Sequence, residues 1–286
     1  GIQSKAAGGA QPFVSLGFLR NYLFPLPPVN EQKRIVEKVN SLMSLLDELE
    51  EKRERRNQKR IKLNNASLEK LLTSKDDKEQ KTNWKRIEEN FSTLYSVPEN
   101  VEKLKQAILQ LAVQGKLVKQ DPKDEPASEL LKKIKKEKDK LIAEGKIKKQ
   151  NELPPIKDDE KPFELPKGWE WVRLEILCTQ ITDGTHYTPT YVDQGIPFLS
   201  VKNLSQGILD FAITKFISEK EHNELAKRCK PEFGDMLLTK VGTTGIAKVV
   251  DVEREFSIFV SVALLKLIPG TIFPLYLEKA FRTPSM

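Results

Sequence analysis

The stretch FPLPPVNEQKRIVEKVNSLMSLLDELEEKRERR, residues 24–56, joins three prolines to a long charged segment. Proline cannot sit inside a helix, so the prolines end whatever precedes them, and Asn30 is the expected N-cap of a helix that starts near residue 30. The apolar residues of this segment step by 4, 3, 4 and 3 positions: Ile35, Val39, Leu42, Leu46 and Leu49. This heptad spacing predicts a helix that packs along another helix.

The predicted helix continues to about residue 72, and about 40 residues at ~1.5 Å each make a rod of ~60 Å. After Leu49 the positions of the apolar seam are taken by arginines, so a partner helix is expected to end or diverge there. A second apolar set follows on a shifted face: Ile61, Leu68, Leu71 and Leu72. Packing within the chain and packing against another chain both remain open for the seam.

Three further helices are predicted after a polar turn at residues 73–82. The first is a short amphipathic helix that carries Trp84, Ile87, Phe91, Leu94 and Tyr95. The second begins near Glu99 and ends before Gly115, with Val101, Leu104, Ile108 and Leu111 on one face. The third lies in residues 121–150, capped by Ser128 or Asp124, with Leu130, Leu131, Ile134 and Leu141 facing inward.

The two ends of the chain differ from this helical middle. Residues 1–28 are expected to be the end of a domain, with one or two short strands in the run 13–24. The absence of an initiator methionine suggests a longer parent protein. Residues 151–168 are proline-rich and predict a flexible linker. The remainder predicts strands, with one helix at 219–227 and another at the end; the strand segments are WEWVRLEIL, GIPFLSVKNL, DMLLTKVG, IAKVVDV and FSIFVSVALLKLI. The predicted fold class is therefore α+β, with long coiled-coil-like helices joined to a β-rich domain.

The charge is unevenly distributed over these three parts. The net charge is +7, with +2 on residues 1–28, +8 on residues 29–150 and −3 on residues 151–286. A polyanionic partner is therefore possible, with the positive excess on the helices. The longest apolar run, residues 258–265, is far shorter than the ~20 residues of a membrane span. Two cysteines, Cys178 and Cys229, indicate neither a disulfide framework nor a zinc site, and a cytoplasmic location is expected.

The sequence contains no clear catalytic constellation. Only two histidines occur, and the glycine loop VGTTG at residues 241–245 lacks the pattern of a phosphate-binding loop. The carboxylates of KDDEK, residues 157–161, are predicted to be a solvated charge run in the linker. No catalytic residue, metal ligand or cofactor is predicted, and an enzyme is the third choice of function.

Polar residues at predicted strand ends are the candidate DNA contacts, because amides, hydroxyls and lysines suit base edges and phosphates. They are Thr185, His186, Tyr187, Lys202, Asn203, Lys240, Thr243 and Thr244. Lys202 and Asn203 are expected to close a strand, whereas the threonines 243 and 244 lie in a turn. For His186 alone, a turn held by Asp183 and Gly184 is the simpler interpretation.

Four stretches of the chain resemble one family, the specificity subunits of type I restriction-modification enzymes. They are FPLPPVNEQKRIVEKV at 24–39, LKQAILQLAVQGKLV at 104–118, DPKDEPASELLKKI at 121–134 and LPKGWEWVRL at 165–174. The resemblance implies a subunit without catalysis of its own, whose two target recognition domains each read one half of a split DNA site. Conserved helices in that family act as a spacer and dock the methyltransferase (M) subunits, through which the restriction (R) subunit joins.

Mapped on this chain, the resemblance implies a tail of a first recognition domain at 1–28, a helical spacer at 29–150 and an incomplete second recognition domain at 151–286. The expected helix-packing or partner residues are those of the seam together with Leu104, Ile108 and Leu111. The expected partners are double-stranded DNA and the M subunits, with no membrane. Because residues 151–286 carry −3, weak DNA binding by the chain alone is expected. A helical protein-interaction scaffold with a β-rich ligand-binding domain is the alternative.

Overall fold

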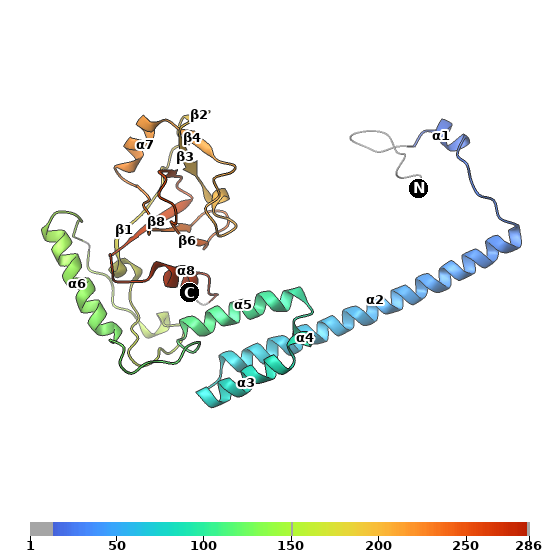
Figure 1. The fold of residues 1–286 in the computed structure, drawn as a ribbon, viewed down its shortest axis with the longest axis horizontal. Coiled ribbons are helices and arrows are strands. Elements are labelled where there is room, and N and C mark those ends of the chain that lie inside the picture. Colours follow the sequence, from blue (N-terminus) through green and yellow to red (C-terminus); the bar gives the residue numbers. More distant parts are fainter. Residues whose placement is uncertain (1–13, 150, 285–286) are drawn as a thin grey trace. The chain divides into compact units, whose positions relative to one another are not determined.

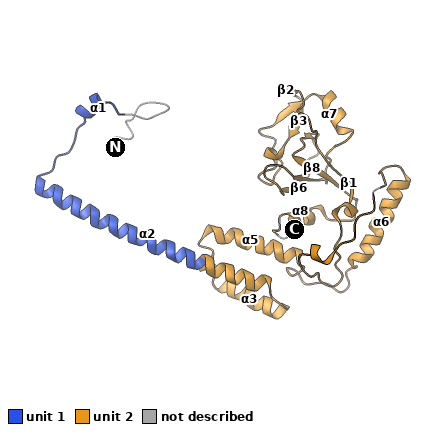
Figure 2. Cartoon of the chain, turned by 180° about the vertical axis from the view of Figure 1, so that it is seen from behind, with its two compact units in different colours: residues 1–60 blue, residues 61–286 orange. Residues whose placement is uncertain are grey.

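The computed structural model describes residues 14–149 and 151–284 of the chain (Figure 1). The chain divides into two compact units, residues 1–60 and residues 61–286 (Figure 2). The long helix α2, Val29–Leu72, contributes to both units, so each unit is described by itself. No described helix is long and apolar enough to cross a membrane.

In the first unit a short helix replaces the predicted strands. Helix α1, Leu16–Arg20, begins where the Ser15 hydroxyl accepts a hydrogen bond from the amide of Phe18 at 3.1 Å. Among residues 14–28 no strand forms, so the expectation of strands was wrong for the described part of that segment. The physical reason is local, because a serine cap satisfies an amide of the first turn without a partner strand. Residues 1–13 lie outside the described residues.

Helix α2 starts directly after the prolines, at Val29 rather than beyond Asn30. The amides of Glu31 and Gln32 donate to the Pro28 carbonyl at 2.8 and 3.0 Å, so Asn30 lies in the first turn and is not the N-cap. The proline can occupy the cap because the cap residue needs no helical amide. The predicted seam runs along this helix with its five side chains 46–53% exposed. Its packing against another helix therefore stays a prediction.

In the second unit the last turns of α2 pack with three further helices. They are α3 (Asp77–Glu89), α4 (Phe91–Leu94) and α5 (Pro98–Val113). The cluster at their centre is apolar and buried: Leu68, Leu71, Ile87, Ala107 and Leu111, with Leu72, Trp84, Tyr95 and Leu104 alongside. Of the predicted second apolar set, Leu68, Leu71 and Leu72 lie in this cluster, whereas Ile61 is half-buried and lies outside it.

Two predicted boundaries in this helical part were wrong. The polar turn is shorter than residues 73–82, because the Asp76 carboxylate accepts from the amide of Glu79 at 2.8 Å and starts α3 early. The amphipathic helix through Tyr95 breaks at Asn90, whose side-chain amide donates to the Arg86 carbonyl at 2.8 Å. Gly115 ends α5 as predicted, with a φ of +67° that favours glycine.

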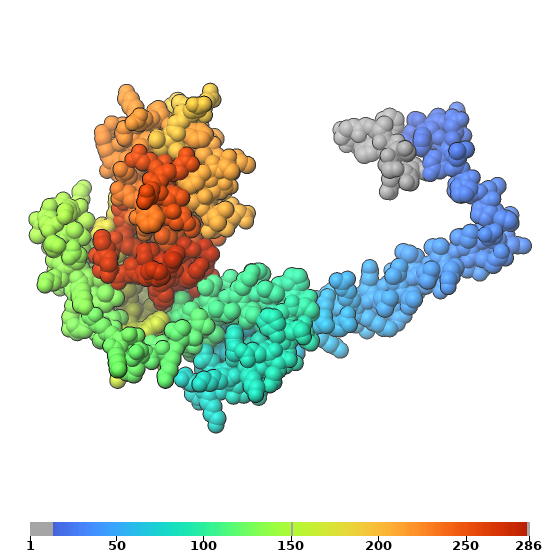
Figure 3. All heavy atoms as spheres, in the orientation of Figure 1, coloured from blue at the N-terminus to red at the C-terminus, as the bar shows by residue number. Residues whose placement is uncertain are grey.

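Helix α6, Ala127–Ala143, joins the helical part to the strands of the second unit. Its N-cap is Pro126, so the prediction of Ser128 or Asp124 as the cap was wrong. The first amide of the helix, on Ala127, donates to the Gly168 carbonyl at 2.8 Å. The Lys138 ammonium donates to the Glu175 carbonyl at 2.6 Å. Figure 3 shows this helix in green against the atoms of the β-rich domain.

The predicted linker, residues 151–168, is bound to the domain that follows it. Arg173 forms two hydrogen bonds to the Glu160 carboxylate, at 2.6 and 2.9 Å, from the short 3-10 helix η2, Asp158–Glu160. The expectation of a free charge run was therefore wrong at Glu160. The predicted strand WEWVRLEIL was also wrong, because it is an irregular segment followed by a 3-10 helix, η3, at Leu174–Leu177.

In the described part of the chain, eight strands form two sheets of four. The first has the order β1-β8-β5-β6 and is antiparallel throughout; its strands are Cys178–Asp183, Val262–Leu267, Met236–Thr239 and Ala247–Val249. The second has the order β2-β4-β3-β7, with β3 and β7 parallel; its strands are Tyr191–Val192, Lys215–Ile217, Ile196–Leu199 and Ser257–Ile258. Helices α7 (Glu219–Ala226) and α8 (Pro274–Phe281) accompany them. The described elements confirm the α+β class.

The apolar run at residues 258–265 is not one strand but a crossing between the sheets. Its first part ends β7, which pairs with β3, and its later part begins β8, which pairs with β1 and β5. A turn separates them, in which the Val262 amide donates to the Phe259 carbonyl at 2.9 Å. Two buried apolar clusters flank this crossing, one with Leu199, Leu237 and Phe256 and one with Met236 and Leu265.

Candidate nucleic-acid interface

Turns from three parts of the β-rich domain meet at the crossing between its sheets. The Thr185 amide donates to the Ile258 carbonyl at 3.2 Å. Ser261 binds two other turns, because its hydroxyl accepts from the Val201 amide at 3.2 Å and its carbonyl accepts from the Lys240 amide at 2.9 Å. The segments that follow β1, β3 and β5 are thereby held beside one another, and each of them carries candidate DNA contacts.

Asp183, at the end of β1, is the centre of this surface. Its carboxylate accepts a hydrogen bond from His186 Nε2 at 3.1 Å and forms short ion pairs with Arg228 Nη2 and Lys240 Nζ. The carboxylate is only 17% exposed, whereas the side chains of His186, Arg228 and Lys240 are 63, 53 and 40% exposed. The recessed Asp183 carboxylate thus binds the exposed side chains of His186, Arg228 and Lys240.

The electrostatics of this cluster favour an ionised Asp183. Burial opposes its ionisation, but hydrogen bonds from Lys240 and His186 outweigh burial and lower the pKa of the carboxyl to about 2. The neighbouring Gly184 allows the close approach of the backbones, because a Cβ there would lie 1.9 Å from the Ile258 carbonyl oxygen. The conformation of the turn at 183–187 therefore depends on the charged Asp183 carboxylate and on a glycine at position 184.

A hollow of about 310 Å³ opens beside the cluster. Leu225, Cys229 and Ile258 contribute apolar atoms to its lining, and Tyr187, His186 and Arg228 contribute polar groups that are exposed. An apolar base with a polar rim suits contact with a flat group that carries hydrogen-bonding edges.

Of four predicted DNA residues in these turns, two are exposed and two are buried. His186 and Tyr187 are exposed in the turn after β1. Thr185 is 7% exposed, and its hydroxyl accepts from the Tyr187 amide at 3.3 Å. Asn203 is 6% exposed and uses its amide group to donate to the Asp210 and Ile213 carbonyls. We therefore assign Thr185 and Asn203 a positioning role within the turns.

The other predicted DNA residues, Lys202, Thr243 and Thr244, lie in two adjoining turns. Lys202 and Asn203 belong to a 3-10 helix, η4 (Val201–Asn203), and do not close a strand as expected. Thr243 and Thr244 are exposed in the turn after β5. The two turns adjoin, since a Cβ at Gly242 would lie 3.6 Å from a methyl group of Val201.

Sequence reasoning missed Arg228. Its Nη2 atom contacts the Asp183 carboxylate and donates to the Asp183 carbonyl at 2.7 Å and the Gly184 carbonyl at 3.3 Å. Among the described residues its Nε and Nη1 atoms form no hydrogen bond, so that edge of the guanidinium remains available. No spacing pattern could reveal this residue, because it follows α7 and is 45 positions from Asp183.

The nucleophilic and metal-binding residue types of the domain are buried or scattered. His222 Nδ1 lies 2.9 Å from the Ser257 hydroxyl, but the two residues are only 2 and 1% exposed. Burial raises the pKa of Cys178 to about 12 and that of Cys229 to about 11, which keeps both thiols protonated and unreactive. In the described part of the chain no group of three His, Cys, Asp or Glu residues could hold a metal ion.

The predicted helix-packing residues fall into two groups. Leu104 and Leu111 of α5 pack in the helical cluster with α2 and α3, and Ile108 is half-buried on the same helix. The seam on the first part of α2 keeps its apolar side chains about half exposed. The α5 residues therefore stabilise the second unit itself, whereas the seam offers an apolar surface.

Comparisons with known proteins agree on one family. A family model described as the type I restriction modification DNA specificity domain matches residues 2–58. The EcoAI type I restriction enzyme specificity subunit of Escherichia coli is 44% identical over 210 residues, which are 73% of this chain and 36% of that subunit. The EcoEI type I restriction enzyme specificity subunit of Escherichia coli is 39% identical over 265 residues, 88% of this chain and 44% of that subunit. The chain spans less than half the length of either relative.

A solved structure concerned with complex assembly and conformational transition of the type I R-M system contains a chain that aligns at 19% identity. The alignment covers 96% of this chain and 46% of that chain, with a TM-score of 0.45.

Proposed function

The chain belongs to the family of type I restriction enzyme specificity subunits, and from that premise we propose that it supplies DNA-sequence specificity to a restriction-modification complex. In this proposal residues 151–286 read one half of a bipartite DNA site. Residues 29–150 form a spacer that docks M subunits and, through them, the R subunit, and residues 1–28 are the tail of a first recognition domain. Methylation and cleavage belong to those partner subunits, so the chain itself is not an enzyme.

The observation that carries the proposal is the convergence of exposed donors on one surface. Arg228 and Lys240 come from two separate segments and share the recessed Asp183 carboxylate. Lys202 is exposed in the turn after β3, which Ser261 joins to the turn after β5. Lysine and arginine supply the attraction to phosphates, and the planar guanidinium of arginine can also bind a guanine edge through two bonds. Two cations, Arg228 and Lys240, meet the single carboxylate of Asp183 here, although residues 151–286 carry a net −3.

Arg228 is the residue of this surface that we expect to read a base. Its guanidinium is fixed on one side by the carboxylate and two carbonyls, so little side-chain freedom is lost when the other side binds DNA. Lys240 has a single flexible ammonium beside the same carboxylate and suits a phosphate. The scaffold alternative has no comparable observation in its favour.

Co-expression with the neighbouring methyltransferase gene, followed by mapping of methylated sites, tests the proposal. The double substitution Arg228→Ala/Lys240→Ala is expected to lower methylation of the target by at least 10-fold, since one good base contact is worth about 1–3 kcal/mol. The matched control is Lys220→Ala/Arg254→Ala, which removes the same charges outside the converging turns. Unchanged methylation in the first variant, or an equal loss in the control, contradicts the proposed DNA surface.

The two side chains are distinguished by single substitutions. Arg228→Ala is expected to relax the methylated consensus at one base pair, whereas Lys240→Ala is expected to weaken all sites alike and reduce their salt dependence. A consensus that keeps every position in Arg228→Ala refutes base reading by Arg228. If every variant still binds the methyltransferase subunit, the loss of methylation is caused by weaker DNA binding and not by failed assembly.

A further inference from the structure

Helix α6 and the residues directly after it carry an excess of positive charge. Residues 127–149 hold nine lysines and four acidic residues, a net charge of +5. The β-rich part that follows, residues 151–286, carries −3. Because the attraction between a protein and DNA comes mainly from Lys and Arg that neutralise phosphates, the net charge of the β-rich part contributes none of it. The lysines of α6 are the neighbouring source of this attraction.

One side of α6 is fixed on the β-rich part and determines where the lysines lie. Ile134 is fully buried, and the Lys138 ammonium donates to the carbonyls of Glu175 at 2.6 Å and Ile176 at 3.4 Å. Figure 1 shows α6 beside β1, the strand that follows these two carbonyls. Positions two residues before and after Ile134 are about 200° away around the helix, so they lie on its outer side.

The outer side of α6 carries a row of exposed lysines. Lys132, Lys136 and Lys140 recur every four residues, so they lie one above another along the helix. Lys132 and Lys140 each form an ion pair within the helix, with Glu129 at 2.7 Å and Glu137 at 3.6 Å. Their side chains are 72 and 61% exposed, and such exposed pairs contribute only about 0–1 kcal/mol. A phosphate can therefore replace the glutamates, and Lys136 forms no ion pair among the described residues.

The length of this row matches several phosphates of one DNA strand. Lys132 and Lys140 are eight residues apart, which is about 12 Å along the helix. A strand carries one phosphate for about every 3.4 Å of the duplex axis, so the row faces about three or four phosphates. A lysine ammonium is a point charge on a flexible stem, so it can reach a phosphate whatever base is attached.

A membrane surface is a poorer match for this helix. A basic helix that lies on a membrane needs an exposed apolar side. The apolar residues of α6 are buried or half-buried on its inner side: Leu130, Leu131, Ile134, Leu141 and Ile142. The outer side therefore offers positive charge alone, which suits a polyanion.

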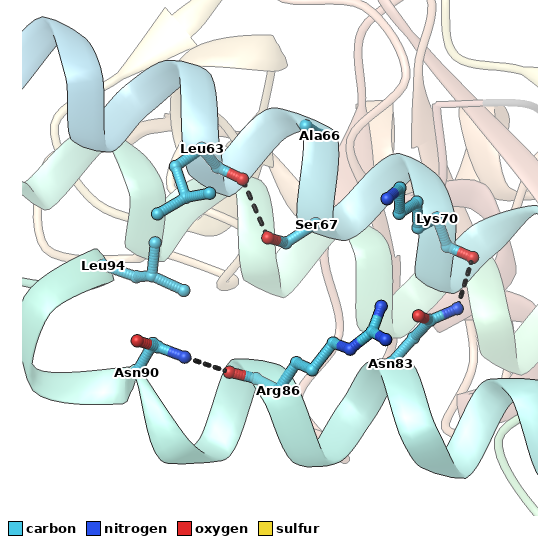
Figure 4. A pocket seen from close by; sticks show the side chains of 8 residues that line it. All are labelled: Leu63, Ala66, Ser67, Lys70, Asn83, Arg86, Asn90 and Leu94. Carbon is cyan, nitrogen blue, oxygen red and sulfur yellow. Dashed lines mark hydrogen bonds between the residues drawn. The ribbon is translucent and has the colours of Figure 1, made fainter.

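Cations elsewhere in the helical part are arranged differently. Figure 4 shows Lys70 and Arg86 in a groove of about 340 Å³ between α2 and α3, where Leu63 and Leu94 point toward one another. Leucine side chains offer a phosphate backbone no hydrogen bond. Lysines of α2 and α3 therefore supply a matched control for the charge on α6.

We propose that α6 binds the phosphate backbone of duplex DNA through Lys132, Lys136 and Lys140, without reading its sequence. The choice of DNA as the ligand rests on the proposed function. Lys138 anchors α6 directly before β1, and Asp183 ends that strand, so the anchor is roughly 20 Å from the turn with the base-reading residues. Helix α6 thus holds the duplex through its phosphates while the turns contact base edges.

Neutral substitutions in the full chain test the row. Lys132→Gln/Lys136→Gln/Lys140→Gln is expected to weaken binding to a random-sequence duplex by about 10-fold or more at about 50 mM salt. The slope of log K against log salt concentration is expected to shrink by about 2–3, because each lost phosphate contact accounts for about 0.9. The anisotropy of a fluorescent duplex, titrated at several salt concentrations, measures both. An unchanged affinity and slope overturn the proposal.

The control Lys62→Gln/Lys70→Gln/Lys81→Gln removes the same total charge from α2 and α3. Less than a 3-fold change in duplex affinity is expected, and a loss equal to that of the α6 variant overturns the proposal. Replacing the three α6 lysines by arginine keeps their charge and is expected to keep the affinity within 2-fold. A loss in the arginine variant as large as in the glutamine variant contradicts a role of charge alone.

Failure of this contact and failure of the proposed function give different results. The α6 variant is expected to weaken a duplex with the mapped methylation site and a random duplex by the same factor, whereas Arg228→Ala reduces the ratio of the two affinities. If the wild-type chain prefers no sequence, the proposed function fails, and a weaker α6 variant still supports the phosphate contact. If the α6 variant binds DNA normally but no longer joins the methyltransferase subunit, α6 is a protein contact and the proposal is overturned.

Discussion

An alanine at position 184 would place a methyl group inside the backbone of the crossing between the two sheets. The added Cβ would lie 1.9 Å from the Ile258 carbonyl oxygen, 2.3 Å from its carbon and 2.5 Å from the Phe259 carbonyl carbon. All three are backbone atoms, which cannot rotate away as the end of a flexible side chain can. The turn at 183–187 must therefore move away from the crossing.

The cost of Gly184→Ala follows from the bonds that this movement breaks. Three backbone hydrogen bonds join the turn to the crossing: Gly184 to Val262 at 3.3 Å, Thr185 to Ile258 at 3.2 Å and Val260 to Thr185 at 3.0 Å. Each contributes about 1 kcal/mol net. We therefore expect a loss of about 3 kcal/mol in the free energy of unfolding of the second unit.

Urea unfolding followed by circular dichroism measures that loss, with Gly17→Ala as the matched control. Gly17 lies in α1, where the nearest atom to an added Cβ is 4.0 Å away, so its replacement is expected to change stability by less than ~1 kcal/mol. Gly184→Ala is also expected to reduce DNA methylation by the complex, because it displaces Asp183 and the donors that Asp183 holds. A Gly184→Ala protein with wild-type stability would refute the close approach on which this reasoning depends.

Three further predictions concern buried polar groups. Asn64 is fully buried, and its side-chain amide has no hydrogen bond among the described residues. Because a buried polar group without a partner destabilises the fold, Asn64→Leu is expected to raise the free energy of unfolding by about 1–2 kcal/mol. A lower melting temperature contradicts this. The pKa of Asp183 is lowered from 3.8 to about 2, so its negative charge stabilises the folded state above pH 4. This contribution to the free energy of unfolding, about 2 kcal/mol, is lost as the pH falls through 2. Asp183→Asn is expected to remove this pH dependence of unfolding. The Glu278 carboxylate accepts a hydrogen bond from the Val249 amide at 2.9 Å and forms an ion pair with Arg282 at 2.9 Å. Glu278→Ala is therefore expected to lower the free energy of unfolding by about 2 kcal/mol, measured by thermal unfolding. An unchanged melting temperature would show that the edge of β6 needs no such partner.

The helical part of the chain could be read from its sequence because its determinants are neighbours along the chain. The prolines before Val29 and the glycine at 115 end or start helices through their own backbone geometry. Leu68 and Leu71 on α2, and Leu104 and Leu111 on α5, recur at helical spacing, and each pair lies on the apolar face that its spacing predicts. Local pattern failed where a distant group intervened, since the N-cap of α6 is Pro126 and the first amide of the helix donates to the distant Gly168 carbonyl.

The DNA surface could be read only in part, because its assembly depends on contacts between distant residues. His186 and Lys240 stood out as polar residues at turns, but nothing near them in the sequence indicated that Asp183 would hold both. The alternative interpretation of a turn held by Asp183 is also correct, since the same carboxylate bonds His186.

Residue order along the chain was enough to establish the α+β class, the long helix with its apolar seam and the kind of side chain at each turn, because these follow from periodicity and backbone preference within a few residues. Pairing of strands across two sheets decided the rest. It split the apolar run at residues 258–265 between β7 and β8, buried Asn203, and brought Arg228 to Asp183. Such pairing depends on which faces and edges meet in space, and that information is shared among segments far apart in the chain.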